Sequence, residues 1–84
     1  MEALSYRLKM ARNMLNISRV EAADMLGIHI QYLADIEGGR RIPSMKMMER
    51  ISRAYMLPVF WFFLPEDVEQ DVTITLRLPI RDNK

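Results

Sequence analysis

Residues 21–39, EAADMLGIHIQYLADIEGG, consist almost entirely of residues that favour a helix, yet Gly27 lies near their centre. A glycine inside a helix costs ~1 kcal/mol relative to alanine, so a single uninterrupted helix is not expected here. A helix that ends at Leu26 needs a following residue that accepts a left-handed backbone, and glycine does so without strain. The stretch therefore predicts two helices joined by a glycine corner.

The positions around this corner match the spacing of a helix-turn-helix motif. Ala23 is small, which lets the two helices approach closely, and Ile28 is an apolar residue that fills the angle between them. Leu33 and Ile36 continue the apolar face of the next helix, which is expected over residues 29–37. A helical hairpin without a function would also use a glycine corner, but the full set of positions favours the helix-turn-helix.

Apolar periodicity and capping residues predict the other helices. Ser18 and Glu21 match a capping box at the start of the helix that ends at Leu26. Ser44 is expected to cap a fourth helix, and Pro58 suits the first position of a short apolar fifth helix, PVFWFFL. The first helix is predicted from one apolar stripe, Leu4, Leu8, Ala11 and Leu15.

Residues 71–80, DVTITLRLPI, alternate between apolar and other side chains, which predicts a half-buried β-strand. No second strand is evident in the sequence, and a lone strand leaves its backbone groups unpaired. The partner strand is therefore expected from another chain, either a second copy or a different protein. The apolar side of the strand comprises Val72, Ile74, Leu76, Leu78 and Ile80, and the first four of these are expected to serve dimerisation.

Four consecutive residues, FWFF at 60–63, form an aromatic cluster that is too dense for one small core. The cluster, with Trp61 as its largest side chain, is expected to help line the junction with the other chain. Ordinary core positions are the alternative, which stays open above all for Phe60 and Phe63.

The composition indicates a small globular domain without bound groups. The chain has 84 residues, of which 50% are hydrophobic and 27% are charged, and it contains no cysteine and one histidine. Disulfides and thiolate metal sites are excluded, and neither a metal nor a cofactor is expected. The longest apolar run, residues 56–64, is too short to cross a bilayer, and the first residues do not match a signal peptide. These features predict a cytoplasmic protein without a membrane partner.

The charges are unevenly distributed, although the net charge is only +1. Residues 1–57 contain nine Lys or Arg against six Asp or Glu, whereas residues 58–84 contain three against five. A local basic patch matters more for phosphate binding than the total charge, so a nucleic-acid partner is not excluded. A solvated basic face would give the same distribution.

Residues 4–57 resemble the lambda-repressor-like family of helix-turn-helix DNA-binding domains, of the Cro/C1 and Xre type. The segment ISRVEAADMLGI, residues 17–28, resembles the second helix of the family, and IEGGRRIPS, residues 36–44, resembles the end of the third helix and the turn after it. Arg12 stands where the family places an arginine that pairs with the glutamate corresponding to Glu37. The resemblance implies an all-α fold, here a five-helix lambda-repressor-like domain over residues 1–66. Residues 67–84 lie outside it and hold the C-terminal β-strand that is expected to pair between chains.

Four positions depart from the family pattern. Ala22 replaces a leucine, so some core volume must come from other residues, with the methionines as candidates. Arg19 replaces the usual glutamine, and His29 replaces the usual serine or threonine. Ile30 occupies a position that is commonly polar. These departures affect the target sequence more than the fold.

The resemblance implies that the helix at residues 29–37 enters the major groove of double-stranded DNA. Gln31 is the best candidate for reading a base, because its amide can bond adenine N6 and N7 together. Ile30 can pack on a thymine methyl group. Asp35 can accept from cytosine N4, or it can keep phosphates at a distance.

Contacts with the DNA backbone are expected from arginines that flank this helix. Arg19, at the positive end of the second helix, and Arg40 and Arg41, in the glycine-rich turn, are candidates for phosphate binding. Solvated side chains are the alternative for each. His29 is expected to contact phosphate or to cap its helix, and Tyr32 either to contact phosphate or to pack.

The function that follows is a sequence-specific DNA-binding transcriptional regulator, most simply a homodimeric repressor on a palindromic operator. The competing hypothesis is an antitoxin-like interaction module whose C-terminal strand pairs with a different regulatory protein. An enzyme is not expected, because the sequence contains no paired carboxylates, no Ser–His arrangement with supporting context and no phosphate-binding loop.

Overall fold

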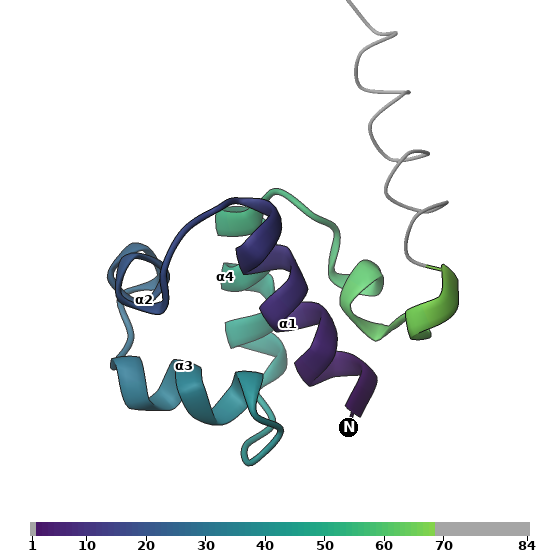
Figure 1. Cartoon of the computed structure of the whole chain (residues 1–84), viewed down its shortest axis with the longest axis horizontal. Coiled ribbons are helices and arrows are strands. Elements are labelled where there is room, and N and C mark those ends of the chain that lie inside the picture. The colour runs from purple at the N-terminus through teal and green to yellow at the C-terminus, as the bar shows by residue number, and fades with distance from the viewer. Residues whose placement is uncertain (1, 69–84) are drawn as a thin grey trace, which may run out of the picture.

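The computed structural model describes residues 2–68, which form four α-helices and two short 3-10 helices (Figure 1). No β-strand occurs within residues 2–68, and the strand predicted at 71–80 lies outside the described residues. The α-helices are α1 (Glu2–Met14), α2 (Arg19–Leu26), α3 (Ile30–Glu37) and α4 (Met45–Tyr55), and the 3-10 helices are η1 (Val59–Phe63) and η2 (Glu66–Val68).

The predicted apolar stripe of the first helix is confirmed at three of its four positions. Leu4, Leu8 and Ala11 are buried in the core, but Leu15 is 40% exposed. The prediction for Leu15 was wrong because α1 ends at Met14. Asn16 then adopts a left-handed backbone with a φ of 60°, which turns the chain away from the helix axis.

The short fifth helix predicted for this segment is present only as η1, a 3-10 helix of five residues, so the described residues contain four α-helices and not five. Pro58 directly precedes η1, and Pro65 is the second residue after it. Leu64 is extended, with a φ of −76° and a ψ of 151°, as expected for a residue that a proline follows. The segment between the prolines forms the tighter i to i+3 bonds, as from the N–H of Trp61 to the carbonyl of Pro58 at 3.0 Å, which are typical of short 3-10 helices.

The aromatic cluster is divided between the core and the surface. Trp61 and Phe62 are 0% exposed and their rings meet edge to face, with centroids 5.2 Å apart. Phe60 and Phe63, for which the core was the open alternative, are 55% and 41% exposed. Trp61, which was predicted to line a junction between chains, therefore belongs to the core of this domain.

The helices pack around one core. In Figure 1, α2 and α3 lie at one side of α1, whereas η1 and η2 lie at the other side. Met48 is buried, and Met10 and Met47 pack partly against the same core, as expected from the small volume of Ala22. None of the helices in residues 2–68 is long and apolar enough to span a membrane, and no group of three acidic or histidine side chains in that range is placed to hold a metal.

Candidate nucleic-acid interface

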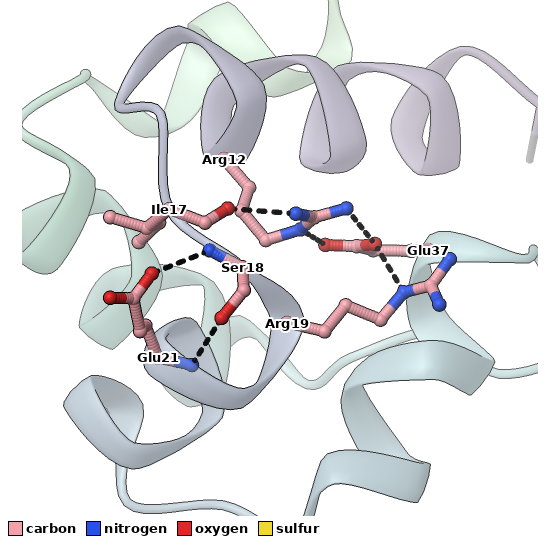
Figure 2. A network of polar contacts seen from close by, with 6 residues as sticks. All are labelled: Arg12, Ile17, Ser18, Arg19, Glu21 and Glu37. Atoms are coloured by element: carbon pink, nitrogen blue, oxygen red, sulfur yellow. Dashed lines mark hydrogen bonds and ion pairs between the residues drawn. The ribbon is translucent and has the colours of Figure 1, made fainter.

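The start of α2 is fixed by the capping box that the sequence predicts. The Ser18 hydroxyl accepts from the backbone N–H of Glu21 at 3.1 Å, and the Glu21 carboxylate accepts from the backbone N–H of Ser18 at 2.8 Å (Figure 2). These bonds satisfy two donors that a helix start leaves open. Arg19 is therefore held at the first position of α2.

Gly27 forms the corner between α2 and α3. Its φ is 69° and its ψ is 36°, which is the left-handed conformation that the sequence predicts. The N–H of Ile28 then donates to the carbonyl of Ala23 at 3.0 Å. The Arg50 side chain of α4 donates to the carbonyl of Leu26 at 3.1 Å, so α4 also helps to end α2. The corner is thus held from both sides, and α3 can begin three residues after Gly27.

His29 caps α3, which was one of its two predicted roles. Its Nδ1 accepts from the backbone N–H of Gln31 at 3.0 Å. The buried face of α3 carries Leu33 and Ile36, whereas Ile30 is 41% exposed and Gln31 is exposed beside it. Ile30 and Gln31, two of the positions expected to face DNA, therefore lie on the open side of α3.

Gln31, Asp35 and Arg40 form one hydrogen-bonded group on that open side. One carboxylate oxygen of Asp35 accepts from the Gln31 amide at 3.1 Å and from Arg40 Nε at 3.0 Å. A second bond from Arg40, to the carbonyl of Ala34 at 3.2 Å, holds the arginine against the end of α3. The bond from Gln31, and then that from Arg40, lowers the pKa of Asp35 below its ordinary value of 3.8.

Arg41 stacks on Tyr32. The centre of its guanidinium lies 5.0 Å from the centroid of the Tyr32 ring, within the range of a cation–π contact. Tyr32 is partly buried and packs against the core, so its ring holds the Arg41 guanidinium near the surface of the domain. Packing, one of the two roles predicted for Tyr32, is confirmed.

Glu37 joins α1, α2 and α3 through two arginines (Figure 2). Arg12 Nε lies 2.7 Å from Glu37 Oε2 and Arg12 Nη2 lies 3.2 Å from Oε1, which is the predicted pair between the first and third helices. Arg12 also donates to the carbonyl of Ile17 at 2.9 Å. The hydrogen bond with Glu37 raises the pKa of Arg12 above its ordinary value. Two cations therefore share one carboxylate.

The second of these cations, Arg19, was predicted only as a phosphate contact or a solvated side chain. Its Nε donates to Glu37 Oε1 at 3.1 Å, while its side chain stays 47% exposed. The Glu37 side chain is only 1% exposed. The ion pair orients Arg19 and leaves the rest of its guanidinium open to solvent.

The arrangement of α2, the glycine corner and α3 is that of a helix-turn-helix, and a comparison of the sequence with protein families agrees. The family model described as Helix-turn-helix matches residues 8–62. The chain belongs to the Xre-type, lambda-repressor-like helix-turn-helix family. Members of this family are DNA-binding regulators, and the helix-turn-helix of this chain supports that general role here. No curated protein and no solved structure matches the chain.

Two further contacts of the helix-turn-helix domain were also not predicted from the sequence. The first is the bond between Gln31 and Asp35, although their i, i+4 spacing on a helix was a usable signal. The second is the position of Arg7, which is 0% exposed, with its guanidinium 4.8 Å from the Trp61 ring. Nothing in the sequence separates Arg7 from the other cations of the first helix, because its contacts come from residues more than fifty positions away.

Proposed function

We propose that this protein is a dimeric, sequence-specific transcriptional repressor that inserts α3 into the major groove of a palindromic operator. The observation that carries the proposal is the grouping of exposed Gln31 and Ile30 on α3 with the arginines of the flanking segments. Side chains with base-reading chemistry lie on the open side of the helix, and cations surround that side. This combination is what DNA recognition by a helix-turn-helix requires.

Gln31 is the proposed base reader. A glutamine reads adenine by donating one amide hydrogen to N7 and by accepting from N6. The amide nitrogen of Gln31 has two hydrogens, and only one of them is used in the bond to Asp35. The other hydrogen and the carbonyl oxygen remain for a base, so Asp35 orients the amide without occupying it.

Asp35 and Ile30 are proposed to add to the specificity. The Asp35 oxygen that does not bind Gln31 and Arg40 can accept from cytosine N4. Ile30 can pack against a thymine methyl group. The negative charge of Asp35 also offsets the positive charge of Arg40. This weakens the attraction of the protein to the phosphates of DNA with unrelated sequence.

Three arginines and His29 are proposed to contact the sugar-phosphate backbone. Arg19 is held by Glu37, Arg40 by Asp35 and Arg41 by the ring of Tyr32. Each cation is thus partly ordered before DNA binds, which lowers the entropy lost on binding. Such contacts fix the position of the domain on DNA but do not read its sequence.

Dimerisation is proposed through the strand at residues 71–80, which lies outside the described residues. One recognition helix reads only a few base pairs, and two-fold symmetry doubles that number and implies half-sites about one helical turn apart. Val72, Ile74, Leu76 and Leu78 would share one face of an antiparallel pair of strands. Trp61 can support this interface only from beneath the surface, because its side chain is 0% exposed.

Selection from a randomised duplex library tests the DNA-binding proposal. The full chain is expected to enrich a palindrome, and Gln31→Ala is expected to cost ~1–3 kcal/mol and to relax the preference at one base pair in each half-site. Arg41→Ala is the control, because it should weaken binding to all sequences alike. No enrichment by the full chain would refute sequence-specific binding, and an unchanged motif with Gln31→Ala would refute the role of that residue.

Sedimentation at micromolar concentration tests the dimer. Deletion of residues 71–84 is expected to give a monomer or an unfolded chain with poor operator binding, because folding and dimerisation are coupled. Thr75→Pro should have the same effect, since it removes a backbone donor in mid-strand. A truncated protein that stays dimeric and binds the palindrome at full affinity would contradict pairing through the strand. A different protein that co-purifies in place of a second copy would favour an antitoxin-like module.

A further inference from the structure

Helix α1 carries a second apolar stripe, which the core covers only in part. Tyr6, Met10 and Met14 follow one another at i, i+4 and i+8 on α1 and line an open hollow of about 350 Å³, with Lys9 and Asn13 beside them. Tyr6 is 41% exposed and Met14 is 38% exposed. The lining is mainly apolar, which favours contact with another apolar surface over contact with water.

Arg7 of α1 binds the backbone of the chain just after η1. Arg7 Nε donates to the carbonyl of Leu64 at 2.9 Å, and its Nη2 donates to the carbonyl of Pro65. These bonds hold Leu64 and Pro65 against α1, and η2 also packs on α1. Met10 and Met14 are three and seven residues after Arg7, so they lie on the same side of α1. The described residues therefore end at Val68, in an element that packs on the helix carrying the stripe.

We propose that residues 72–80 of the same chain lie along α1 and cover the stripe formed by Tyr6, Met10 and Met14. The three residues 69–71 can span up to ~10 Å, which is enough to connect a segment that starts beside α1 to the hollow. A second copy is not needed to reach it.

The spacing of the two sets of apolar side chains supports this placement. Residues four apart on a helix are displaced by ~6 Å along its axis. Alternate residues on a strand are displaced by ~6.6–6.8 Å and point to the same face. Val72, Ile74 and Leu76 therefore match Tyr6, Met10 and Met14 with a cumulative drift of little more than ~1 Å. Leu78 and Ile80 extend past Met14 towards the exposed Leu15.

The polar residues beside the hollow fit the same occupant. Lys9 is exposed at its rim, and Glu69 and Asp71 precede the apolar part of the segment. A carboxylate at either position can pair with the Lys9 ammonium. Asn13 offers an amide to the backbone of the segment.

The docked segment keeps both backbone edges open. A strand that lies on a helix uses its side chains, not its N–H and C=O groups, for that contact. The edges therefore remain free for pairing with a second copy, so the inference agrees with the proposed dimer. It does not depend on DNA binding, and it is tested on the free protein.

A nitroxide label at the hollow tests the proposal in the full chain. The chain has no cysteine, so Asn13→Cys gives a single attachment point at the rim. We expect the amide NMR signals of residues 72–76 to be lost to paramagnetic broadening and to return when the nitroxide is reduced. The same label at Met25→Cys on α2, away from η2 (Figure 1), should leave those signals intact.

A mixed sample identifies which chain supplies the segment. Chains that carry the nitroxide but no isotope are mixed with isotopically enriched chains that carry no nitroxide. Any broadening in this sample comes from a contact between two chains. Broadening that occurs when label and isotope are on the same chain but is absent from the mixed sample supports the proposal, whereas broadening that persists in the mixed sample would assign the hollow to a second copy and overturn it. Intact signals in both samples would overturn it as well, and DNA binding by the full chain is measured separately.

Two matched variants complete the test. Met10→Glu places a charge in the centre of the stripe, and it should restore the signals of residues 72–76 in the Asn13-labelled chain. Ile42→Glu places the same charge at an apolar residue that is 63% exposed and lies outside the hollow, and the signals should remain lost. Equal behaviour of the two variants would contradict docking on the stripe.

Discussion

Arg19 Nε lies 3.1 Å from Glu37 Oε1, so a half-exposed cation at the start of α2 shares the buried carboxylate that holds Arg12. One carboxylate between two arginines leaves a net positive charge. Because Arg12 is buried, the excess charge is presented by Arg19 on the surface. The ion pair that holds the helices together thus also positions a side chain that we propose for DNA binding.

Glu37→Gln is expected to destabilise the domain by about 3–5 kcal/mol, because it leaves the buried Arg12 guanidinium without a counter-charge. Arg19→Ala should cost less than about 1 kcal/mol, since its side chain is half exposed and its ion pair is screened by water. Urea denaturation at neutral pH measures both free energies of unfolding. Similar losses for the two variants would contradict the unequal burial of the two pairs.

Gln31→Ala is expected to raise the pKa of Asp35 towards its ordinary value of 3.8, because the amide of Gln31 is the main group that lowers it. The lowered pKa means that the stabilising contact is fully present above pH 3.8 and is lost as the pH falls through the lowered pKa. Titration of the Asp35 carboxyl carbon by NMR measures the change. Arg41→Ala, which acts on Asp35 only through its charge, should change the pKa less.

Arg40→Ala and Arg41→Ala are each expected to reduce the slope of log affinity against log salt by about one charge, because each proposed phosphate contact releases counterions. Binding titrations on specific and random duplexes between low and high salt measure the slopes. Asp35→Asn should instead strengthen binding to random DNA, since Arg40 then loses the charge that offsets it. A loss of base preference with Arg41→Ala would mean that the turn reads the sequence.

Tyr55→Phe is expected to protect the domain from alkaline unfolding. Burial raises the pKa of Tyr55 from 10.0 to about 12, with the charge of Glu37 as the next cause. Stability is therefore retained below pH 10 and decreases as the pH rises through the folded pKa, by up to roughly 2–3 kcal/mol for this group. The Tyr55 hydroxyl has no hydrogen-bond partner among the described residues, so its removal should cost little at neutral pH.

Denaturation curves at pH 7 and in the alkaline range measure this difference. Tyr6 and Tyr32 are still present in Tyr55→Phe, so the variant isolates the buried hydroxyl. An equal loss of stability in the parent chain and the variant would assign the alkaline transition to other groups.

Gly27→Ala is expected to cost about 1–2 kcal/mol through backbone strain alone, because its φ of 69° is in the left-handed region. An added Cβ would meet no heavy atom within 4 Å, so no clash contributes. Gly27→Asn should cost less, since asparagine tolerates this conformation better. Thermal denaturation compares the two variants, and a neutral Gly27→Ala would contradict the strain argument.

The sequence alone was enough to predict the helix-turn-helix, because its signals are local. The capping box of Ser18 and Glu21 and the left-handed Gly27 depend on hydrogen bonds and backbone sterics within a few residues. The Arg12–Glu37 pair was predicted from the resemblance to the family, and the structure confirms it.

Other features depend on contacts between residues that are distant in the sequence. Which of four consecutive aromatic residues enters the core depends on the prolines that limit η1 and on the position of α1, so Trp61 and Phe62 are buried and their neighbours are not. The sharing of Glu37 by Arg19 and the burial of Arg7 have the same origin. Local patterns determine where helices begin and end. Which side chains are buried from solvent is determined only by the tertiary structure, because burial depends on all neighbouring residues together.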